Sequence, residues 1–201
     1  MHNGQGVTGS ADGVDGTVWN VVGHTYTPKL LSDNTFIWHA VVPEDTFVPP
    51  HVHPTQDEWI YVLEGNLEVD FGFEEGNVTA NKAGPGDMVR MPMGVAHGVY
   101  NRSGKSAKCV FGVAPTRKLF DLFGKLDGVT DPDELVRLAA LHEVDFLPPP
   151  PDAVELEAAA DTAANQLPDV VVDDVSAGNK VNLRNVAPAD TPILLWMYAP
   201  H

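Results

Sequence analysis

Four residues in the middle of the chain could together bind a metal ion. His51 and His53 are one residue apart, so in an extended segment both imidazoles lie on the same face. Glu58 follows after a short polar segment, and His97 lies in a later segment that we expect to form a neighbouring strand. Three imidazoles and one carboxylate are a plausible set of ligands for a divalent transition metal.

Two longer stretches place these residues in a wider pattern. The first reads H-x-H-x4-E-x6-G and ends at Gly65, and the second reads G-x5-P-x-G-x2-H-x3-N and runs from Gly86 to Asn101. They resemble the paired signature motifs of the cupin superfamily over roughly residues 35–115. The second matches at every fixed position. The first has Asp45 where the family usually has a leading glycine, which we expect to change a turn and leave the ligands untouched.

The resemblance implies both a fold and a metal site. Cupins are small antiparallel β-barrels of the jelly-roll type, and their matching three histidines and one glutamate bind a metal ion inside the barrel. By that resemblance the metal ligands are His51, His53, Glu58 and His97. The cofactor is then one divalent transition metal ion (Fe, Ni, Mn, Co, Cu or Zn), and the ligand types do not select among these.

The segments around the motifs favour an all-β barrel followed by C-terminal helices. Short runs rich in Val, Ile, Trp, Tyr and Phe alternate with glycine-containing turns, as in β-sandwiches and barrels. The predicted strands are 17–22, 35–42, 58–63, 67–73, 88–91, 97–100 and 107–113. We therefore expect a flexible N-terminus over 1–16, a barrel over 17–115, and an extension over 116–201.

The predicted extension is helical, with short terminal strands. Residues 118–126 could form a short helix, and a stronger helix is predicted to begin after Asp131, which can cap it, with Pro132 in the first turn. A further helix is predicted over 153–166, with short strands over 170–172 and 193–198.

The sequence around the first motif narrows the expected chemistry. Residues 49–65 resemble the quercetin-dioxygenase-like single-domain cupins, which implies a metal-dependent dioxygenase that takes O₂ and a small enolic or phenolic, flavonol- or diketone-like substrate. The resemblance makes Glu58 both a ligand and the catalytic base. Ile60, Val62 and Val99 are our candidates for contacts with the substrate.

Two other functions stay open at this point. One is a metal-dependent isomerase or lyase, in which the metal polarises a carbonyl and no oxygen is consumed. The other is a small-molecule-binding cupin without enzymatic activity. Apart from Arg90 and Arg102, no Lys or Arg cluster accompanies the motifs, which argues mildly against sugar phosphates.

Composition excludes some partners. The formal net charge of −16 is opposite to that of nucleic-acid-binding proteins. The N-terminus lacks the pattern of a signal peptide, and no apolar run approaches the roughly 20 residues that cross a membrane. The single cysteine, Cys109, lies in an apolar run and is interpreted as a small core residue. We expect a cytoplasmic protein, without nucleic-acid or membrane partners, that forms a homodimer.

Overall fold

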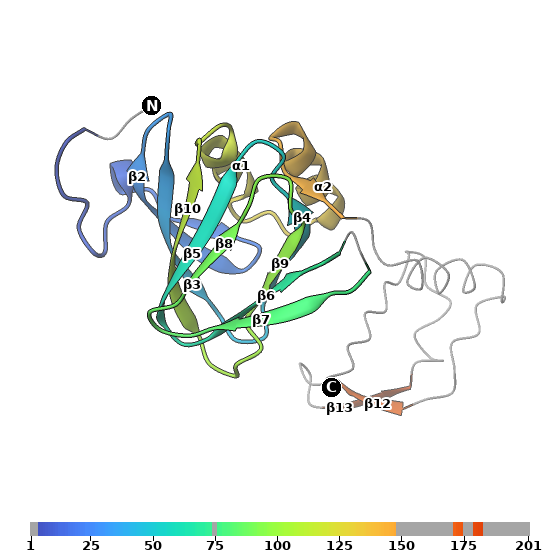
Figure 1. Ribbon diagram of the computed structural model, residues 1–201. Coiled ribbons are helices and arrows are strands. Elements are labelled where there is room, and N and C mark those ends of the chain that lie inside the picture. Colours follow the sequence, from blue (N-terminus) through green and yellow to red (C-terminus); the bar gives the residue numbers. More distant parts are fainter. Residues whose placement is uncertain (1–3, 74–75, 148–170, 175–178, 183–201) are drawn as a thin grey trace. The chain divides into compact units, whose positions relative to one another are not determined.

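The computed structural model describes residues 4–73, 76–147, 171–174 and 179–182 (Figure 1). A short 3-10 helix over Val14–Gly16 precedes the first strand. The strands of residues 1–147 are β1 (Trp19–Val21), β2 (His24–Leu31), β3 (Phe36–Val42), β4 (Phe47–Val52), β5 (Asp57–Glu64), β6 (Leu67–Phe71), β7 (Thr79–Ala83), β8 (Met88–Met91), β9 (His97–Tyr100), β10 (Ala107–Ala114) and β11 (Asp145–Phe146). Between β10 and β11 lie the helices α1 (Leu119–Leu126) and α2 (Pro132–Leu141).

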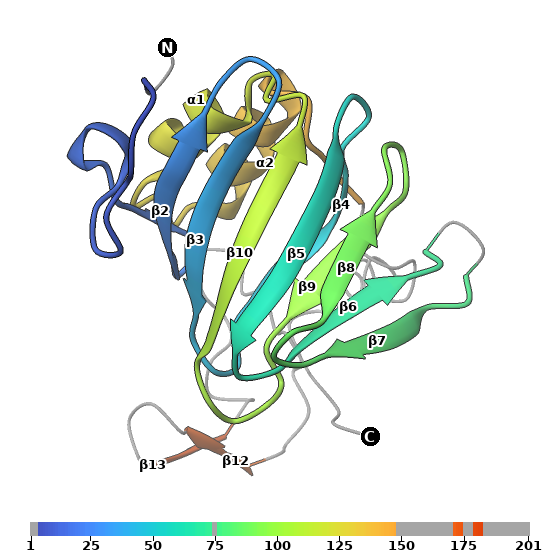
Figure 2. The same cartoon turned by 60° about the vertical axis from the view of Figure 1, so that its left-hand side comes forward.

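These strands form two antiparallel sheets. One has the order β1-β2-β3-β10-β5-β8, and the other has the order β11-β4-β9-β6-β7. Figure 2 shows β2, β3, β10, β5 and β8 side by side. Strands distant in sequence are neighbours, as where β10 pairs with both β3 and β5. Two antiparallel sheets with this strand order confirm the predicted jelly-roll fold.

The core lies between the two sheets because side chains alternate along the strands. In β3, Phe36, Trp38, Ala40 and Val42 are almost fully buried, whereas the residues between them are partly exposed. Cys109 faces the same interior and is fully buried, which confirms its place in the core.

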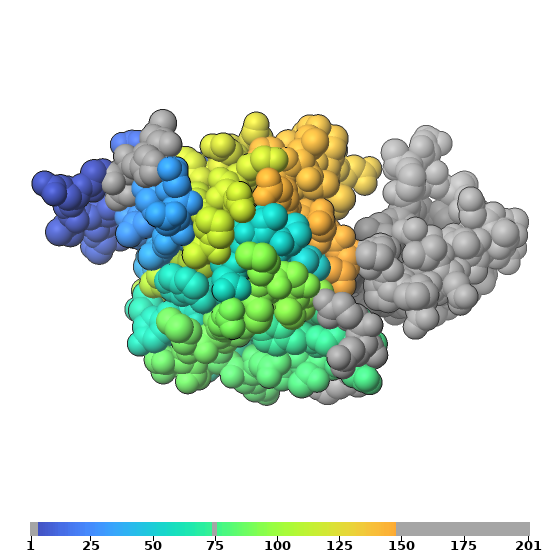
Figure 3. All heavy atoms as spheres, turned by 45° about the horizontal axis from the view of Figure 1, so that its top comes forward, coloured from blue at the N-terminus to red at the C-terminus, as the bar shows by residue number. Residues whose placement is uncertain are grey.

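The two helices and the barrel belong to one compact unit, residues 1–147. Helix α1 buries Leu119, Leu122, Phe123 and Leu126 along one face. Helix α2 begins as predicted, because the Asp131 side chain accepts a hydrogen bond from the Asp133 backbone N–H. Figure 3, seen from the top of Figure 1, shows the yellow and orange atoms of this segment packed against those of the strands.

Three of the longer barrel strands were missed by the sequence pattern, as were the short strands β11 and β13. Strand β2 contains Pro28, and its pairing with β3 shifts register between Pro28 and Leu30. Strand β4 contains Pro49 and Pro50, and prolines ordinarily argue against a strand. Strand β7 is a polar edge strand, with four of its five residues exposed. In each case pairing with neighbouring strands outweighs local propensity.

The C-terminal residues are described only in part. Strand β12 (Val171–Asp174) pairs with β13 (Asn179–Asn182) in a two-stranded antiparallel sheet, and β12 overlaps the strand predicted over 170–172. The predicted helix over 153–166 and the predicted strand over 193–198 lie outside the described residues.

The motif turns adopt the backbone that their sequence requires. Gly65 and Gly94 have φ values of 78° and 76°, in the left-handed region that glycine favours. Asp45, which replaces the family glycine, has φ 58°. Aspartate tolerates this region better than most residues, so the replacement keeps a glycine-like conformation at this turn.

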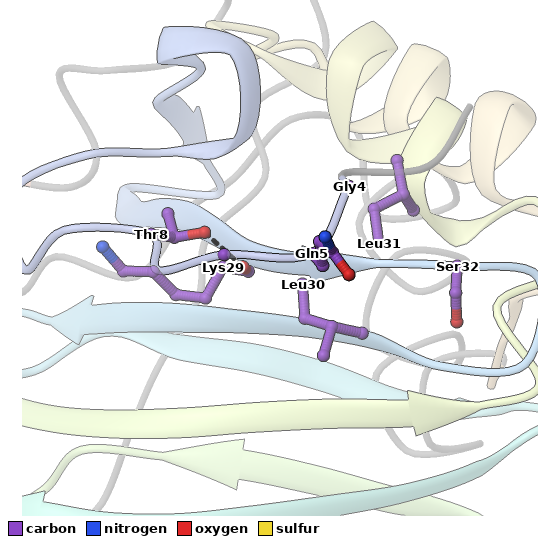
Figure 4. A pocket seen from close by; sticks show the side chains of 8 residues that line it. Gly4, Gln5, Thr8, Lys29, Leu30, Leu31 and Ser32 are labelled. Carbon is purple, nitrogen blue, oxygen red and sulfur yellow. Dashed lines mark hydrogen bonds between the residues drawn. The ribbon is translucent and has the colours of Figure 1, made fainter.

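A hollow of ≈ 540 Å³ lies beside strand β2, where the N-terminal segment passes it (Figure 4). The Thr8 hydroxyl donates to the Lys29 carbonyl at 2.9 Å. The Lys29 ammonium donates to the backbone carbonyls of Gly9 and Ser10, so this lysine anchors the segment. None of the predicted metal ligands lines this hollow.

No helix among the described residues is long and apolar enough to cross a membrane.

Candidate metal centre

The predicted ligands come from three strands that meet inside the barrel. His51 lies near the end of β4, and His53 follows directly after that strand. Glu58 is the second residue of β5, and His97 is the first residue of β9. His51 and His97 are register partners in the antiparallel pair β4-β9, which brings histidines 46 positions apart in sequence next to each other.

The ligand atoms of these four residues converge. One ligand atom from each of His51, His53, Glu58 and His97 lies within 4.8 Å of the other three. The Glu58 Oε2 atom is 3.1 Å from His53 Nε2 and 3.2 Å from His97 Nε2. All four residues are at most 5% exposed, so water does not compete freely for them.

Hydrogen bonds around the cluster fix which histidine nitrogen faces its centre. Nδ1 of His51 donates to the Pro49 carbonyl at 2.8 Å, and Nδ1 of His97 donates to the Val95 carbonyl at 3.0 Å. Because a carbonyl oxygen only accepts, each Nδ1 carries a proton, and each Nε2 is the ring nitrogen that faces the centre and could bind a metal. Such outer hydrogen bonds are typical of metal-binding histidines.

Gln56 fixes the third histidine. Its side-chain N–H groups donate to the carbonyls of Pro115 and Thr116 at 3.0 and 2.7 Å. Its Oε1 must therefore face His53, whose Nδ1 donates to it at 3.0 Å. The Nε2 atom of His53 then also faces the centre, so three Nε2 atoms and one carboxylate fit a divalent transition metal. Gln56 is fully buried and was not singled out by its sequence.

The charges inside the cluster also suit a cation. Burial, followed by the nearby His97 and His53, lowers the pKa of His51 to about 3, so this imidazole is neutral. Burial alone would raise the pKa of Glu58, but the charge of His53 and hydrogen bonds from His53 and His97 lower it. Burial opposes a charge on His53, yet the Glu58 carboxylate raises its pKa. Metal binding would displace the proton of His53.

An apolar cavity of ≈ 50 Å³ adjoins the cluster. His51, His53 and Glu58 belong to its lining, and the remaining lining is almost entirely aliphatic or aromatic. Helix α1 supplies Leu119, Leu122, Phe123 and Leu126, and α2 supplies Leu135 and Ala139. The two helices therefore form a roof over the interior, and none of the lining residues is Lys or Arg.

Tyr26 brings a hydroxyl group into this apolar interior. The Thr46 hydroxyl donates to the Pro43 carbonyl at 2.7 Å, so it accepts from His24 Nε2 at 2.9 Å. His24 Nδ1 then holds a lone pair and accepts from the Tyr26 hydroxyl at 3.3 Å. Burial lowers the pKa of His24 to about 4, so it stays neutral near pH 7. The Tyr26 hydrogen is therefore committed to His24.

The residues expected to contact substrate divide into two groups. Val99 lines the cavity beside the ligands. Ile60 and Val62 are fully buried on β5, but neither is among the lining residues. Sequence reasoning missed Tyr26, whose strand contains Pro28, and Trp38, whose aromatic ring gave no local sign of bordering a cavity.

Comparisons with known proteins agree with this arrangement. Residues 38–113 match the family model described as Cupin domain. A probable germin-like protein (subfamily 2 member 5) of Arabidopsis thaliana is 45% identical over 49 residues, 24% of this chain and 23% of that protein. The tetracenomycin polyketide synthase protein TcmJ of Streptomyces glaucescens is 29% identical over 90 residues, 44% of this chain and 57% of that protein.

The chain thus spans about a quarter to just over half of these curated relatives. Among solved structures, an RmlC-like cupin from Shewanella frigidimarina superposes with a TM-score of 0.50 at 16% identity, covering 60% of this chain and 99% of that chain. At this identity the likeness concerns the fold alone. With the matched Cupin domain, the two antiparallel sheets and the buried cluster of three histidines and a glutamate, the chain contains a jelly-roll domain with the cupin fold.

Proposed function

We propose that this protein is a metal-dependent dioxygenase that acts on a small enolic or phenolic substrate. The observation that carries this proposal is the position of the His₃Glu cluster, which is buried and faces an apolar cavity. Four protein ligands leave coordination positions open for other molecules. A bound transition metal would supply Lewis acidity and, if redox-active, electron transfer to dioxygen.

Glu58 is the residue that we propose takes the substrate proton. Its contacts with His53 and His97 both involve Oε2, so Oε1 is the oxygen that we assign to the substrate proton. The lowered pKa of Glu58 makes it a weak base while His53 carries a proton. Metal binding would release that proton to solvent, and Oε1 would then be the carboxylate oxygen that takes the substrate proton.

The walls of the cavity favour an uncharged and compact substrate. A cavity of 150 Å³ is known to accommodate benzene, whereas the volume here is ≈ 50 Å³. A diketone or a single aromatic ring therefore requires small displacements of the roof, and a three-ring flavonol requires larger ones. Phosphorylated substrates are disfavoured, because Arg90 pairs with Asp57, and Arg102 with Glu68 and Asp70, outside the lining.

A second candidate function is Lewis-acid chemistry without oxygen, in an isomerase, lyase or ring-closing enzyme. One specific finding favours it. Two of the curated relatives, from Streptomyces glaucescens and Streptomyces cyaneus, are named as polyketide synthase proteins. The same cluster and aromatic walls would suit a metal that stabilises an enolate.

Elemental analysis of tag-free purified protein, with His97→Ala as the control, separates these functions. Near one equivalent of Fe, Ni, Mn, Co or Cu, lost in the variant, supports the dioxygenase. Oxygen uptake with diketones, catechols and flavonols then identifies the substrate class. Zinc alone, with no oxygen uptake, favours the second candidate. Failure to bind any metal after reconstitution would contradict both and leave a small-molecule-binding protein.

A further inference from the structure

Trp38 carries a buried hydrogen-bond donor for which the protein provides no acceptor. Its side chain is 1% exposed, and its Nε1 atom has no hydrogen-bond partner among the described residues. A buried donor without a partner destabilises the folded protein, because it has lost its hydrogen bond to water and gained none in return. Native structures retain few such groups, and each calls for an explanation such as a bound molecule.

The position of Trp38 indicates where an acceptor would come from. Of the three buried side-chain atoms without a partner in the described part of the chain, two belong to His39 and Asp70, which do not line the cavity. Trp38 lines it together with His51, His53 and Glu58.

The indole ring is held in place on several sides. It stacks on Phe36 with the ring centroids 4.8 Å apart and on Phe111 with the centroids 5.4 Å apart. The ring of Phe123, from helix α1, meets it edge-on at 5.1 Å. Rotation toward an acceptor elsewhere would break these contacts, so the N–H direction is set before any ligand enters.

Every other side-chain N–H or O–H donor of the lining is already committed. The Nδ1 atoms of His51 and His53 donate to Pro49 and Gln56. The Tyr26 hydroxyl donates to His24. The indole N–H is therefore the one side-chain donor of the described lining residues that has no acceptor.

We propose that the Trp38 indole N–H orients the substrate by donating to a second oxygen, distinct from the oxygen that the metal binds. This inference rests on the proposed function and narrows its substrate class. The substrate is an enolic or phenolic molecule with an additional hydroxyl, carbonyl or ether oxygen. An analogue that lacks this oxygen leaves the donor unpaired and binds roughly 3- to 10-fold more weakly.

Nuclear magnetic resonance of zinc-loaded protein with ¹⁵N-labelled indole nitrogens tests the proposal. The probes are phenol, which has one oxygen, and catechol, resorcinol and hydroquinone, which place a second oxygen at three different positions. The chain has four tryptophans, and Trp38→Phe assigns the signal. Trp59→Phe is the matched control, because Trp59 is not part of the cavity lining.

We expect at least one of the three diols to move the Trp38 indole signal and to bind more tightly than phenol. That preference should vanish in Trp38→Phe and persist in Trp59→Phe. Binding of the diols without any change in the Trp38 signal would overturn the inference and leave the proposed function intact. If zinc is bound but none of the four probes binds, the proposed function fails as well. The change in the signal is read in the unmodified protein, so only the assignment of the signal and the comparison of affinities use Trp38→Phe.

Discussion

Replacing Gln56 by leucine should weaken metal binding although Gln56 is not a ligand. Gln56 accepts from His53 Nδ1 and is itself held by the carbonyls of Pro115 and Thr116. Leucine has a similar size but offers no acceptor. His53 would then be free to rotate and to place its proton on either nitrogen, so part of its population would present the wrong atom to the metal.

The magnitude follows from the bonds that are lost. Removing a hydrogen bond behind a metal-binding histidine typically lowers metal affinity 10- to 100-fold, which corresponds to about 1.4–2.7 kcal/mol. Folding stability should also fall, because the Pro115 carbonyl loses the Gln56 donor, at a cost of about 1–3 kcal/mol. The Thr116 carbonyl suffers less, since it also accepts from the Leu119 N–H at 3.3 Å.

Competition with a chromophoric chelator measures the affinity for zinc, and chemical denaturation measures the stability. Thr55→Ala is the control, because it removes a hydrogen bond to Glu143 in the same loop and leaves His53 untouched. We expect the control to keep the wild-type zinc affinity. Equal zinc affinities for Gln56→Leu, the control and the wild type would refute the reasoning, even if Gln56→Leu were less stable.

Three further predictions concern the ligands, the buried histidine and a tight contact. His97→Ala should abolish stoichiometric metal binding and leave the circular dichroism spectrum of a folded barrel; an unfolded spectrum would contradict a functional role for this site. Burial lowers the pKa of His24 from its ordinary value of 6.5 to about 4 in the folded protein. Between these two pH values the unfolded chain binds a proton at His24 that the folded protein does not, so the stability falls as the pH falls. For His24 this loss amounts to about 3 kcal/mol, and metal-free His24→Gln should lose correspondingly less between pH 7 and pH 4; equal losses would show that His24 does not contribute. Gly112→Ala would place a Cβ atom 2.2 Å from the Trp59 ring, so it should cost about 1–3 kcal/mol, and an unchanged thermal midpoint would argue against this contact.

The barrel and its metal ligands could be predicted because short sequence segments with fixed spacings specify them. His51 and His53 lie in one extended segment, and fixed spacings carry Glu58 and His97. The strands that were predicted have the β-branched and aromatic residues that a half-buried sheet selects. A two-residue period also specifies which side chains face inward, so the family pattern and the alternation support the same core.

The cavity could not be predicted because its walls come from distant parts of the chain. Trp38 and Phe123 meet although 85 positions separate them. The hydrogen bond from Gln56 to Thr116 spans 60 positions. Neither contact produces a periodic pattern in the sequence. The prolines of β2 and β4 argue against strands, so the strands that carry Tyr26 and His51 were not predicted. The placement of Ile60 and Val62 depends on which buried positions border empty space, which alternation alone does not reveal.

In this protein, metal binding and access to the interior depend on different parts of the chain. All four ligands come from residues 51–97, whereas the roof comes from residues 119–146. A graft that replaced the roof could change which molecules reach the interior while the ligands kept their positions. The Gln56 side chain connects the ligands to the roof, since it is hydrogen-bonded both to His53 and to the segment that leads into α1. A designer who exchanges the roof therefore has to preserve the backbone carbonyls of Pro115 and Thr116. They hold Gln56, and Gln56 orients the metal ligand His53.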